Sequence, residues 1–451
     1  MRRLILIAAL AAVLVLPESA AADEVDPGLL WMDGRLSDLT EGSVVPEPSY
    51  SAQDTSPVQR AEQNGSFIVT YKGAFPEDAK TAFQYALDTW SRYLDVKVPI
   101  RVEANWKVLG AGKLGTAGPT KLLSGFPGAP SGHWYPIALA NQIAGTDLDA
   151  KSVDITSNFA STQKSFYFGT DGRTPRGKFD FVSVVMHEIG HGLGLTGTAD
   201  VVGTNGTIGS PPKYTASAIY DVFVVNSNAK PLFGGFKTKT PELKQALTSG
   251  GLFWYGANGV AATPGTAPRL FAPTTWSDSS VYHLDEETFA AGSADSLMSP
   301  MLDDEESQHR VGPVIRGILS DIGWTLAPVA PAYLYFLDVP AGTQPGELLL
   351  TQPKVAVLNG RGYTVAEDNE TVITLSLVGT GGDAALSCDG GLVKTAREGL
   401  AKYTGCRIEG TGIGLRVVAW AEGLTSAESP PFVVIRRGNF RGLTAGVSRD
   451  E

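Results

Sequence analysis

The stretch VVMHEIGHGLGLTG, residues 184–197, places two of the five histidines of this 451-residue chain four positions apart. On a helix, His187 and His191 project from one face, where two imidazole nitrogens reach one zinc ion at about 2.0–2.1 Å. Glu188 directly follows the first histidine, beside the open side of such a metal, where a carboxylate acts as general base. The stretch therefore predicts a helix over 181–192, capped by Asp180, that carries a catalytic metal.

Glycines crowd the end of this predicted helix. Gly190 and Gly192 add nothing to its stability, since each glycine costs up to about 1 kcal/mol relative to alanine. Gly194 is explained by a turn that requires a positive φ just after the second histidine. Zinc bound by two histidines alone is under-coordinated, so a third ligand must come from another part of the chain.

The pattern H-E-x-x-H-x-x-G, matched by His187, Glu188, His191 and Gly194, resembles the signature of the metzincin zinc peptidases. Most metzincins continue with x-x-H, but Gly197 stands at that position here. In leishmanolysin-like members a long insertion precedes the third histidine, and a methionine-bearing turn follows it. The stretch SSVYHLDEETFAAGSADSLMSP, 279–300, is similar, because a histidine precedes a methionine by fifteen residues.

The resemblance implies that His283 is the third zinc ligand and that Met298 forms the apolar floor beneath the metal. Asp200 is the alternative third ligand, because carboxylates also bind zinc. We expect His309, which follows a run of acidic residues, to be solvated. His133 is interpreted as a surface or packing residue, with a place in the substrate cleft as the alternative.

The insertion contributes further candidates. Asp221, Trp254 and Tyr255 are candidates for lining the cleft. Tyr282, next to the proposed ligand, is interpreted as a packing residue, with stabilisation of an oxyanion as the alternative.

Hydrophobic patterning divides the rest of the chain. Arg2 and Arg3, an apolar run over 4–16 and three alanines before Asp23 are typical of a secretory signal peptide. From about 347, short alternating runs separated by turn residues resemble the Ig-like modules of bacterial exported proteins. The predicted fold is α+β, a metzincin-like domain followed by an all-β sandwich. Its segments are a signal peptide (1–22), a flexible leader or pro-segment (23–64), a catalytic domain (65–326, with an insertion at about 198–280), a linker (327–346), an Ig-like β-sandwich (347–437) and a tail (438–451).

Within the catalytic domain, alternating or helical spacing predicts the main elements. We expect strands at 66–71, 96–102 and 153–159, a helix beginning at Pro76, and a closing helix within 312–324.

Charge and cysteine content limit the partners. The formal charge of −11 has no long run of either sign, which argues against nucleic acid, and no stretch beyond the signal is long enough to span a membrane. The two cysteines, Cys388 and Cys406, are expected to form a disulfide in an exported chain.

These observations predict a secreted zinc metalloendopeptidase, extracellular or periplasmic, that acts as a monomer on protein or peptide substrates. A zinc-activated water would attack the peptide bond with Glu188 as base; whether a structural Ca²⁺ is also present stays open. One alternative is an exported adhesin that retains a catalytically dead peptidase fold. Another is a zinc hydrolase that cleaves a non-peptide bond.

Overall fold

The computed structural model describes residues 23–25, 30–35, 66–130, 132–209, 216–263, 265–341, 344–360, 362–380 and 383–435, the first two ranges as backbone only. The predicted signal peptide and the tail from 438 lie outside these ranges. The described chain is a mixed α+β protein with many strands and few helices. None of its described helices combines the length and the hydropathy that crossing a bilayer requires.

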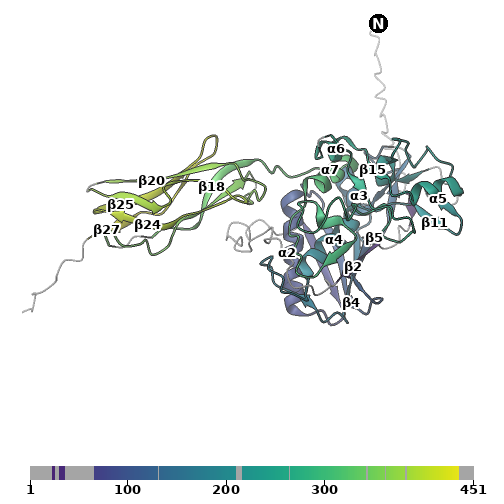
Figure 1. The fold of residues 1–451 in the computed structure, drawn as a ribbon, viewed down its shortest axis with the longest axis horizontal. Coiled ribbons are helices and arrows are strands. Elements are labelled where there is room, and N and C mark those ends of the chain that lie inside the picture. The colour runs from purple at the N-terminus through teal and green to yellow at the C-terminus, as the bar shows by residue number, and fades with distance from the viewer. Residues whose placement is uncertain are drawn as a thin grey trace, which may run out of the picture.

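A six-stranded sheet organises the first part of the structure (Figure 1). Three of its strands are parallel, β3 (Phe67–Lys72), β4 (Ile100–Lys107) and β8 (Ile155–Ala160), and β5 (Lys113–Pro119) runs antiparallel to β8. The strand predicted at 96–102 begins only at Ile100, while the strands predicted at 66–71 and 153–159 agree to within two residues.

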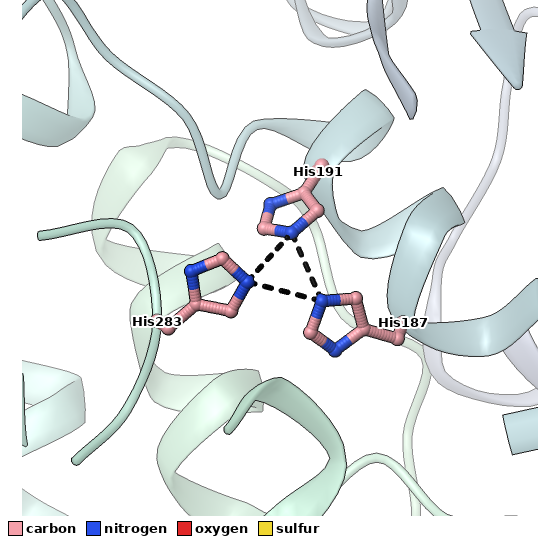
Figure 2. A group of neighbouring side chains, drawn as sticks. All are labelled: His187, His191 and His283. Atoms are coloured by element: carbon pink, nitrogen blue, oxygen red, sulfur yellow. Dashed lines mark hydrogen bonds between the residues drawn. The ribbon is translucent and has the colours of Figure 1, made fainter. Parts of the chain in front are cut away.

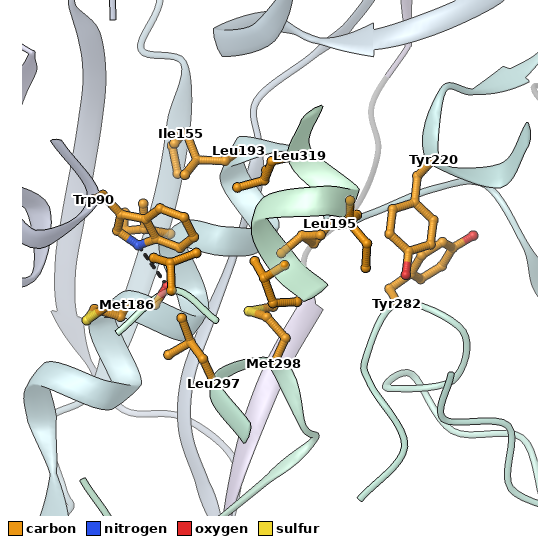
Figure 3. Packing of buried hydrophobic residues seen from close by; sticks show 14 of the residues in the cluster. Trp90, Ile155, Met186, Leu193, Leu195, Tyr220, Tyr282, Leu297, Met298 and Leu319 are labelled. Atoms are coloured by element: carbon orange, nitrogen blue, oxygen red, sulfur yellow. Dashed lines mark hydrogen bonds between the residues drawn. The ribbon is translucent and has the colours of Figure 1, made fainter. Parts of the chain in front are cut away.

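Two long helices pack together beside this sheet. Helix α2 (Glu77–Tyr93) buries the apolar stripe seen in the sequence and lies against α4 (Phe181–Leu193), which packs across β5 and β8. The indole Nε1 of Trp90 donates to the carbonyl of Met186 at 3.0 Å, which fixes α2 against the helix that carries the histidine pair (Figure 3). Helix α7 (Pro313–Ile322) closes this part of the chain, within the predicted range.

The leader contributes two strands to the fold. β1 (Asp23–Val25) pairs with β6 (Leu122–Ser124), and β2 (Leu30–Arg35) lies between β5 and β17 (Met301–Asp303) in the main sheet. The composition of residues 23–64 predicts a flexible leader, yet residues 23–25 and 30–35 are strands. Segments that join a sheet edge through main-chain hydrogen bonds need no hydrophobic period, so composition gave no signal.

Short elements fill the segments around the histidines. The insertion expected at about 198–280 holds short strands and short helices, among them a helix within PELKQALTSG, 241–250, where the sequence predicts one. These elements are β11 (Asp200–Val202), β12 (Asn205–Thr207), β13 (Ser217–Ala218), η1 (Tyr220–Phe223), β14 (Val224–Asn226), α5 (Pro241–Leu247), β15 (Leu252–Trp254), α6 (Ala257–Ala261) and β16 (Arg269–Leu270). Elsewhere lie β7 (His133–Pro136), α3 (Ile137–Ala144), β9 (Phe166–Tyr167), β10 (Phe179–Asp180) and η2 (Ser296–Met298).

The C-terminal part is all β and has a hydrophobic core of its own. Its first strand, β18 (Pro331–Asp338), lies inside the stretch expected to be a linker, because Leu334 and Phe336 alternate into that core. The proline content of this stretch favours a linker, but the alternation of Leu334 and Phe336 into the core produces a strand. The remaining strands are β19 (Lys354–Asn359), β20 (Val372–Thr380), β21 (Ala385–Asp389), β22 (Val393–Thr395), β23 (Leu400–Lys402), β24 (Thr404–Glu409), β25 (Gly412–Trp420), β26 (Ala427–Glu428) and β27 (Phe432–Val434).

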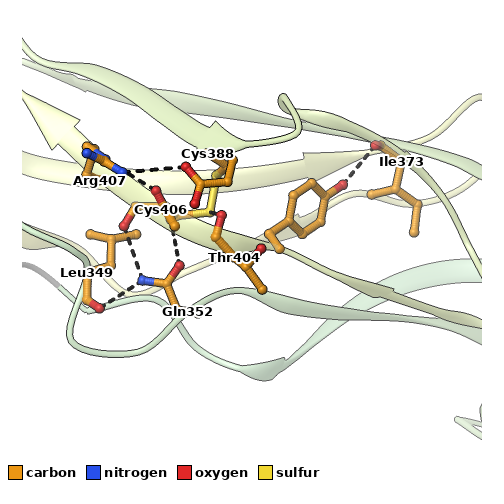
Figure 4. Close-up of a disulfide and its surroundings, with 10 residues drawn as sticks. Leu349, Gln352, Ile373, Cys388, Thr404, Cys406 and Arg407 are labelled. Carbon is orange, nitrogen blue, oxygen red and sulfur yellow. Dashed lines mark hydrogen bonds and ion pairs between the residues drawn. A yellow bond between two sulfur atoms is a disulfide. The ribbon is translucent and has the colours of Figure 1, made fainter.

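The predicted disulfide is present and joins Cys388 of β21 to Cys406 of β24, which are neighbouring antiparallel strands (Figure 4). Gln352 supports the bridge, since its amide nitrogen donates to the Cys406 carbonyl at 3.1 Å and its amide oxygen accepts from the Cys406 N–H at 2.6 Å. The bridge therefore ties together two antiparallel strands that are not consecutive in the chain.

Replacing both cysteines by alanine should lower the free energy of unfolding of the C-terminal part by about 3 kcal/mol, because the bridge closes an 18-residue separation. The transition of the first part should not move, since the two cores are separate clusters. Calorimetry of the full chain measures both transitions, and reduction of the unmodified chain serves as the matched control. A shift of both transitions, or of neither, would contradict this assignment.

Candidate metal centre

The helix that carries the histidine pair is capped at Asp180, as predicted. The Asp180 carboxylate accepts the backbone N–H of Ser183 at 2.7 Å, which satisfies one of the free donors at the helix start. His309 also donates to this carboxylate through Nε2 at 2.8 Å, and both side chains are fully buried. The prediction of a solvated His309 is therefore wrong: it ties the segment after Met298 to the start of α4.

Three histidines converge at the other end of α4. His187 and His191 project from one helix face, and His283 arrives from the segment that follows the insertion (Figure 2). Their Nε2 atoms lie 3.1 Å apart for His187 and His191, 3.1 Å for His187 and His283, and 3.2 Å for His191 and His283. The three ligand atoms form one small triangle inside the protein.

The opposite ring nitrogens show which tautomer each histidine adopts. Each Nδ1 contacts a backbone carbonyl, that of Leu297 at 2.8 Å for His187, Leu195 at 2.8 Å for His191 and Ser279 at 2.7 Å for His283. A carbonyl can only accept, so each Nδ1 carries the proton and each Nε2 presents a lone pair. The three Nε2 atoms are therefore acceptors that point at one another, and a cation placed between them can bind all three.

Burial favours the neutral, metal-binding form of these rings. All three side chains are 1% exposed or less. Loss of solvent lowers the pKa of His191 to about 4, and it lowers the pKa values of His187 and His283 well below the ordinary range, with the neighbouring histidines adding to the effect. At neutral pH the rings therefore need not lose a proton to bind a metal.

The geometry fits a transition metal. Zinc held by three nitrogens at about 2.0–2.1 Å with tetrahedral angles separates them by about 3.3–3.4 Å, close to the observed triangle. Asp200, the alternative third ligand, is exposed on β11, outside the group formed by His187, His191 and His283. His133 also lies outside this group.

Two glycines of the motif make room for the floor of the site. A Cβ at Gly190 would lie 2.7 Å from the Sδ of Met298, and one at Gly192 would lie 2.4 Å from Ile155. Met298 is 1% exposed and packs against α4 in the apolar cluster that also holds Leu195 (Figure 3). Its carbonyl accepts the N–H of Leu284 at 2.8 Å, which connects the methionine turn to the segment that carries His283.

Gly197 is explained by what packs against it. A Cβ there would lie 2.1 Å from Oδ1 of Asp221 and 2.5 Å from the ring of Tyr282. The Tyr282 hydroxyl donates to Asp221 at 2.9 Å, and Thr198 donates to the same carboxyl through its N–H at 2.9 Å. Burial raises the pKa of Asp221 to about 6, although these hydrogen bonds oppose the shift. The buried pair holds the residue adjacent to His283, so Tyr282 has the predicted packing role.

The candidate base is equally enclosed. Glu188 is fully buried beside β5, where a Cβ at Gly115 would lie 2.7 Å from its Oε1. The sequence pattern does not single out Gly115, and it predicts a place in the cleft for Asp221, because both residues act through contacts between distant segments.

A cleft of about 370 Å³ adjoins this side of the centre. Its lining includes Lys113 of β5, Trp276, Ser279, whose carbonyl accepts from His283, and Met301 of β17. Asp221 and Trp254, proposed as cleft residues, are instead fully buried, and Tyr255 is exposed but does not line this cleft.

No family model matches the chain, and no curated protein matches its sequence. Function is therefore inferred from the chemistry of these residues.

His283→Ala should weaken metal binding by at least roughly 10–100-fold, because only two nitrogens remain to hold the metal. Loss of a residue that hydrogen-bonds to a ligand already costs a factor in this range, and here the ligand itself is lost. Metal content per chain and titration with a competing chelator measure the effect. His133→Ala, a change outside the triangle, is the matched control. If His283→Ala still holds one metal per chain with unchanged affinity, a carboxylate supplies the third ligand.

Gly197→Ala should destabilise the first part of the structure by about 1–3 kcal/mol, because its Cβ overlaps both Asp221 and Tyr282. Metal affinity should fall with it, since Tyr282 precedes His283. Urea unfolding and chelator competition measure the two effects. Gly110→Ala is the control, as the nearest atoms to a Cβ there are 3.7 Å away on the flexible Lys113 side chain. Equal stability and equal metal affinity of the Gly197→Ala and Gly110→Ala variants would show that close packing at Gly197 supports neither the fold nor the centre.

Proposed function

We propose that this chain is a secreted zinc endopeptidase with a metzincin-like catalytic domain. The observation that carries the proposal is the triangle of three buried Nε2 acceptors on the helix that also holds Glu188. Three histidines form a ligand set used by catalytic zinc, because the set leaves a fourth position open. The histidine triangle, the methionine beneath it and the glycine turn at Gly194, with φ of 127°, agree with the metzincin resemblance.

Zinc fits this donor set better than a hard cation does. Neutral imidazoles suit zinc, copper, iron and nickel, whereas magnesium and calcium prefer oxygen ligands. When bound, zinc supplies a Lewis acid that polarises the scissile carbonyl and lowers the pKa of water. His187, His191 and His283 would hold it, each oriented by the carbonyl that accepts its Nδ1–H.

Glu188 performs the proton transfers in this proposal. It follows His187 on the same helix, and the backbone of Gly115 limits where its carboxylate can lie. Glu188 takes a proton from the attacking water and then delivers it to the nitrogen that leaves. Enclosure of the carboxylate strengthens its interaction with a nearby cation, because the local dielectric is low.

The Ig-like assignment of the C-terminal part remains a proposal. Its support is an all-β arrangement of a three-stranded, a five-stranded and a two-stranded sheet that contribute to one apolar core. The disulfide joins neighbouring strands, unlike the inter-sheet bridge of antibody domains. We assign no catalytic residue to this part.

Glu188→Gln should reduce cleavage of casein by roughly 10²–10⁴-fold or more, because the amide cannot accept the proton. Its metal content should stay close to that of the parent chain, since Glu188 is not a ligand. Cleavage by the parent should stop with a chelator and return with zinc. Glu287→Gln, a substitution of a nearby exposed glutamate, is the matched control.

Undiminished cleavage by Glu188→Gln would overturn the proposed mechanism. A parent chain that binds zinc but shows no chelator-sensitive cleavage would favour the adhesin.

A further inference from the structure

Val281 lies two residues before the third histidine and has a backbone conformation that its side chain disfavours. Its φ is 75°, in the left-handed region, where a β-branched residue is a genuine outlier. Val281 is fully buried, whereas the other non-glycine residues with positive φ in the described chain are exposed or partly exposed; these are Ala229, Lys239, Glu305 and Glu398. Such a conformation persists only where the surrounding structure holds it, and it is commonest at functional sites.

Hydrogen bonds hold both peptide groups next to the Cα of Val281. Its N–H donates to the carbonyl of Phe271 at 2.7 Å, and its carbonyl accepts from the hydroxyl of Tyr220 at 3.2 Å. The N–H of Phe271 in turn donates to the carbonyl of His283 at 2.9 Å. A change of φ to the ordinary negative range would rotate these peptide groups and break at least one of the bonds. The bonds therefore oppose relaxation of the turn.

The strained turn determines where the third ring points. The Nδ1–H of His283 donates to the carbonyl of Ser279 at 2.7 Å, so residues 279–283 form a closed loop with Val281 at its midpoint. This loop places Nε2 of His283 within 3.1 Å and 3.2 Å of the Nε2 atoms of His187 and His191. Relaxation at Val281 would move the Ser279 carbonyl relative to Nδ1, and the ring would turn out of the triangle.

Tyr220 comes from the insertion and is itself held in place. Its side chain is buried, and its ring centroid lies 4.7 Å from that of Trp254 and 5.4 Å from that of Tyr282 (Figure 3). Trp254 is anchored through its Nε1, which donates to Asp321 of α7 at 2.8 Å. Burial raises the pKa of Tyr220 above its ordinary value, so the hydroxyl keeps its proton at neutral pH. A donor at a fixed position therefore faces the Val281 carbonyl.

We propose that Tyr220 is a positioning residue for the third metal ligand, because its hydroxyl holds the turn at Val281 in the conformation that directs His283 into the histidine triangle. Tyr220 acts through the main chain of Val281 and is not a ligand. The inference rests on the metal centre of the proposed function and not on peptide cleavage, so it can be tested with zinc or cobalt alone.

The test removes the hydroxyl in the full chain with Tyr220→Phe. Zinc affinity, measured by competition with a chelator, should fall about tenfold, because the Val281 carbonyl loses its partner and the ring of His283 is less closely held. The visible absorption of the Co²⁺-loaded protein should also change, since it depends on the arrangement of the nitrogen ligands. Tyr135→Phe is the matched control, because it removes a buried hydroxyl that has no hydrogen-bond partner in the described chain.

Substitutions at Val281 separate strain from packing. Glycine adopts a positive φ without steric cost, so adding Val281→Gly should return the zinc affinity of the Tyr220→Phe variant to within about twofold of the parent and restore the Co²⁺ spectrum. Val281→Ala also empties space in the core but keeps a Cβ, so it should restore neither. Urea unfolding of each metal-free chain shows whether the variants fold.

Parent zinc affinity and an unchanged Co²⁺ spectrum in Tyr220→Phe would overturn the inference. Equal recovery with glycine and with alanine at position 281 would also overturn it, because the effect would then come from packing. The expected zinc and Co²⁺ results without casein cleavage by the parent would leave the positioning role standing and refute the peptidase. Chelator-sensitive cleavage by a parent whose metal binding does not depend on Tyr220 would support the peptidase and refute this inference.

Discussion

The centre depends on three hydrogen bonds that fix the histidine tautomers. The carbonyls of Leu297, Leu195 and Ser279 each hold one Nδ1–H, which turns the three Nε2 lone pairs toward one point. Each carbonyl belongs to a different stretch: the methionine turn, the turn after α4 and the end of the insertion. The geometry of the candidate metal centre therefore depends on contacts between distant segments, because displacement of any one stretch would turn a ring away from the others.

Close approach explains the unusual glycine content around this helix. At Gly115, Gly190 and Gly197 a Cβ would overlap Glu188, Met298 and the Asp221–Tyr282 pair respectively. These glycines weaken local propensity, yet they let the candidate base Glu188, Met298 and the Asp221–Tyr282 pair lie against backbone. Gly197 therefore lacks a side chain for a structural reason. Asp221, from the insertion between Gly197 and His283, packs against its backbone.

Features that depend on contacts within a few residues could be predicted from the sequence, whereas features that depend on contacts between distant segments could not. The α4 helix, its Asp180 cap and the shared face of His187 and His191 follow from contacts within a few residues. His283 lies 96 positions from His187, and only the family resemblance singled it out. The acidic residues before His309 suggested solvent, but the buried Asp180 that receives it is 129 positions away. The leader strands escaped prediction because main-chain pairing carries no side-chain pattern.

The histidine triangle and the strand beside it are held in place by different interactions. The histidine rings lie in a dry core, where a misplaced polar group costs about 1–3 kcal/mol, so their positions are closely fixed. The strand β2 is instead held between β5 and β17 by ladder hydrogen bonds, each worth about 1 kcal/mol net. Misplacing a buried ring therefore costs more than losing one ladder hydrogen bond, so the geometry of the centre is fixed more tightly than the strand beside it.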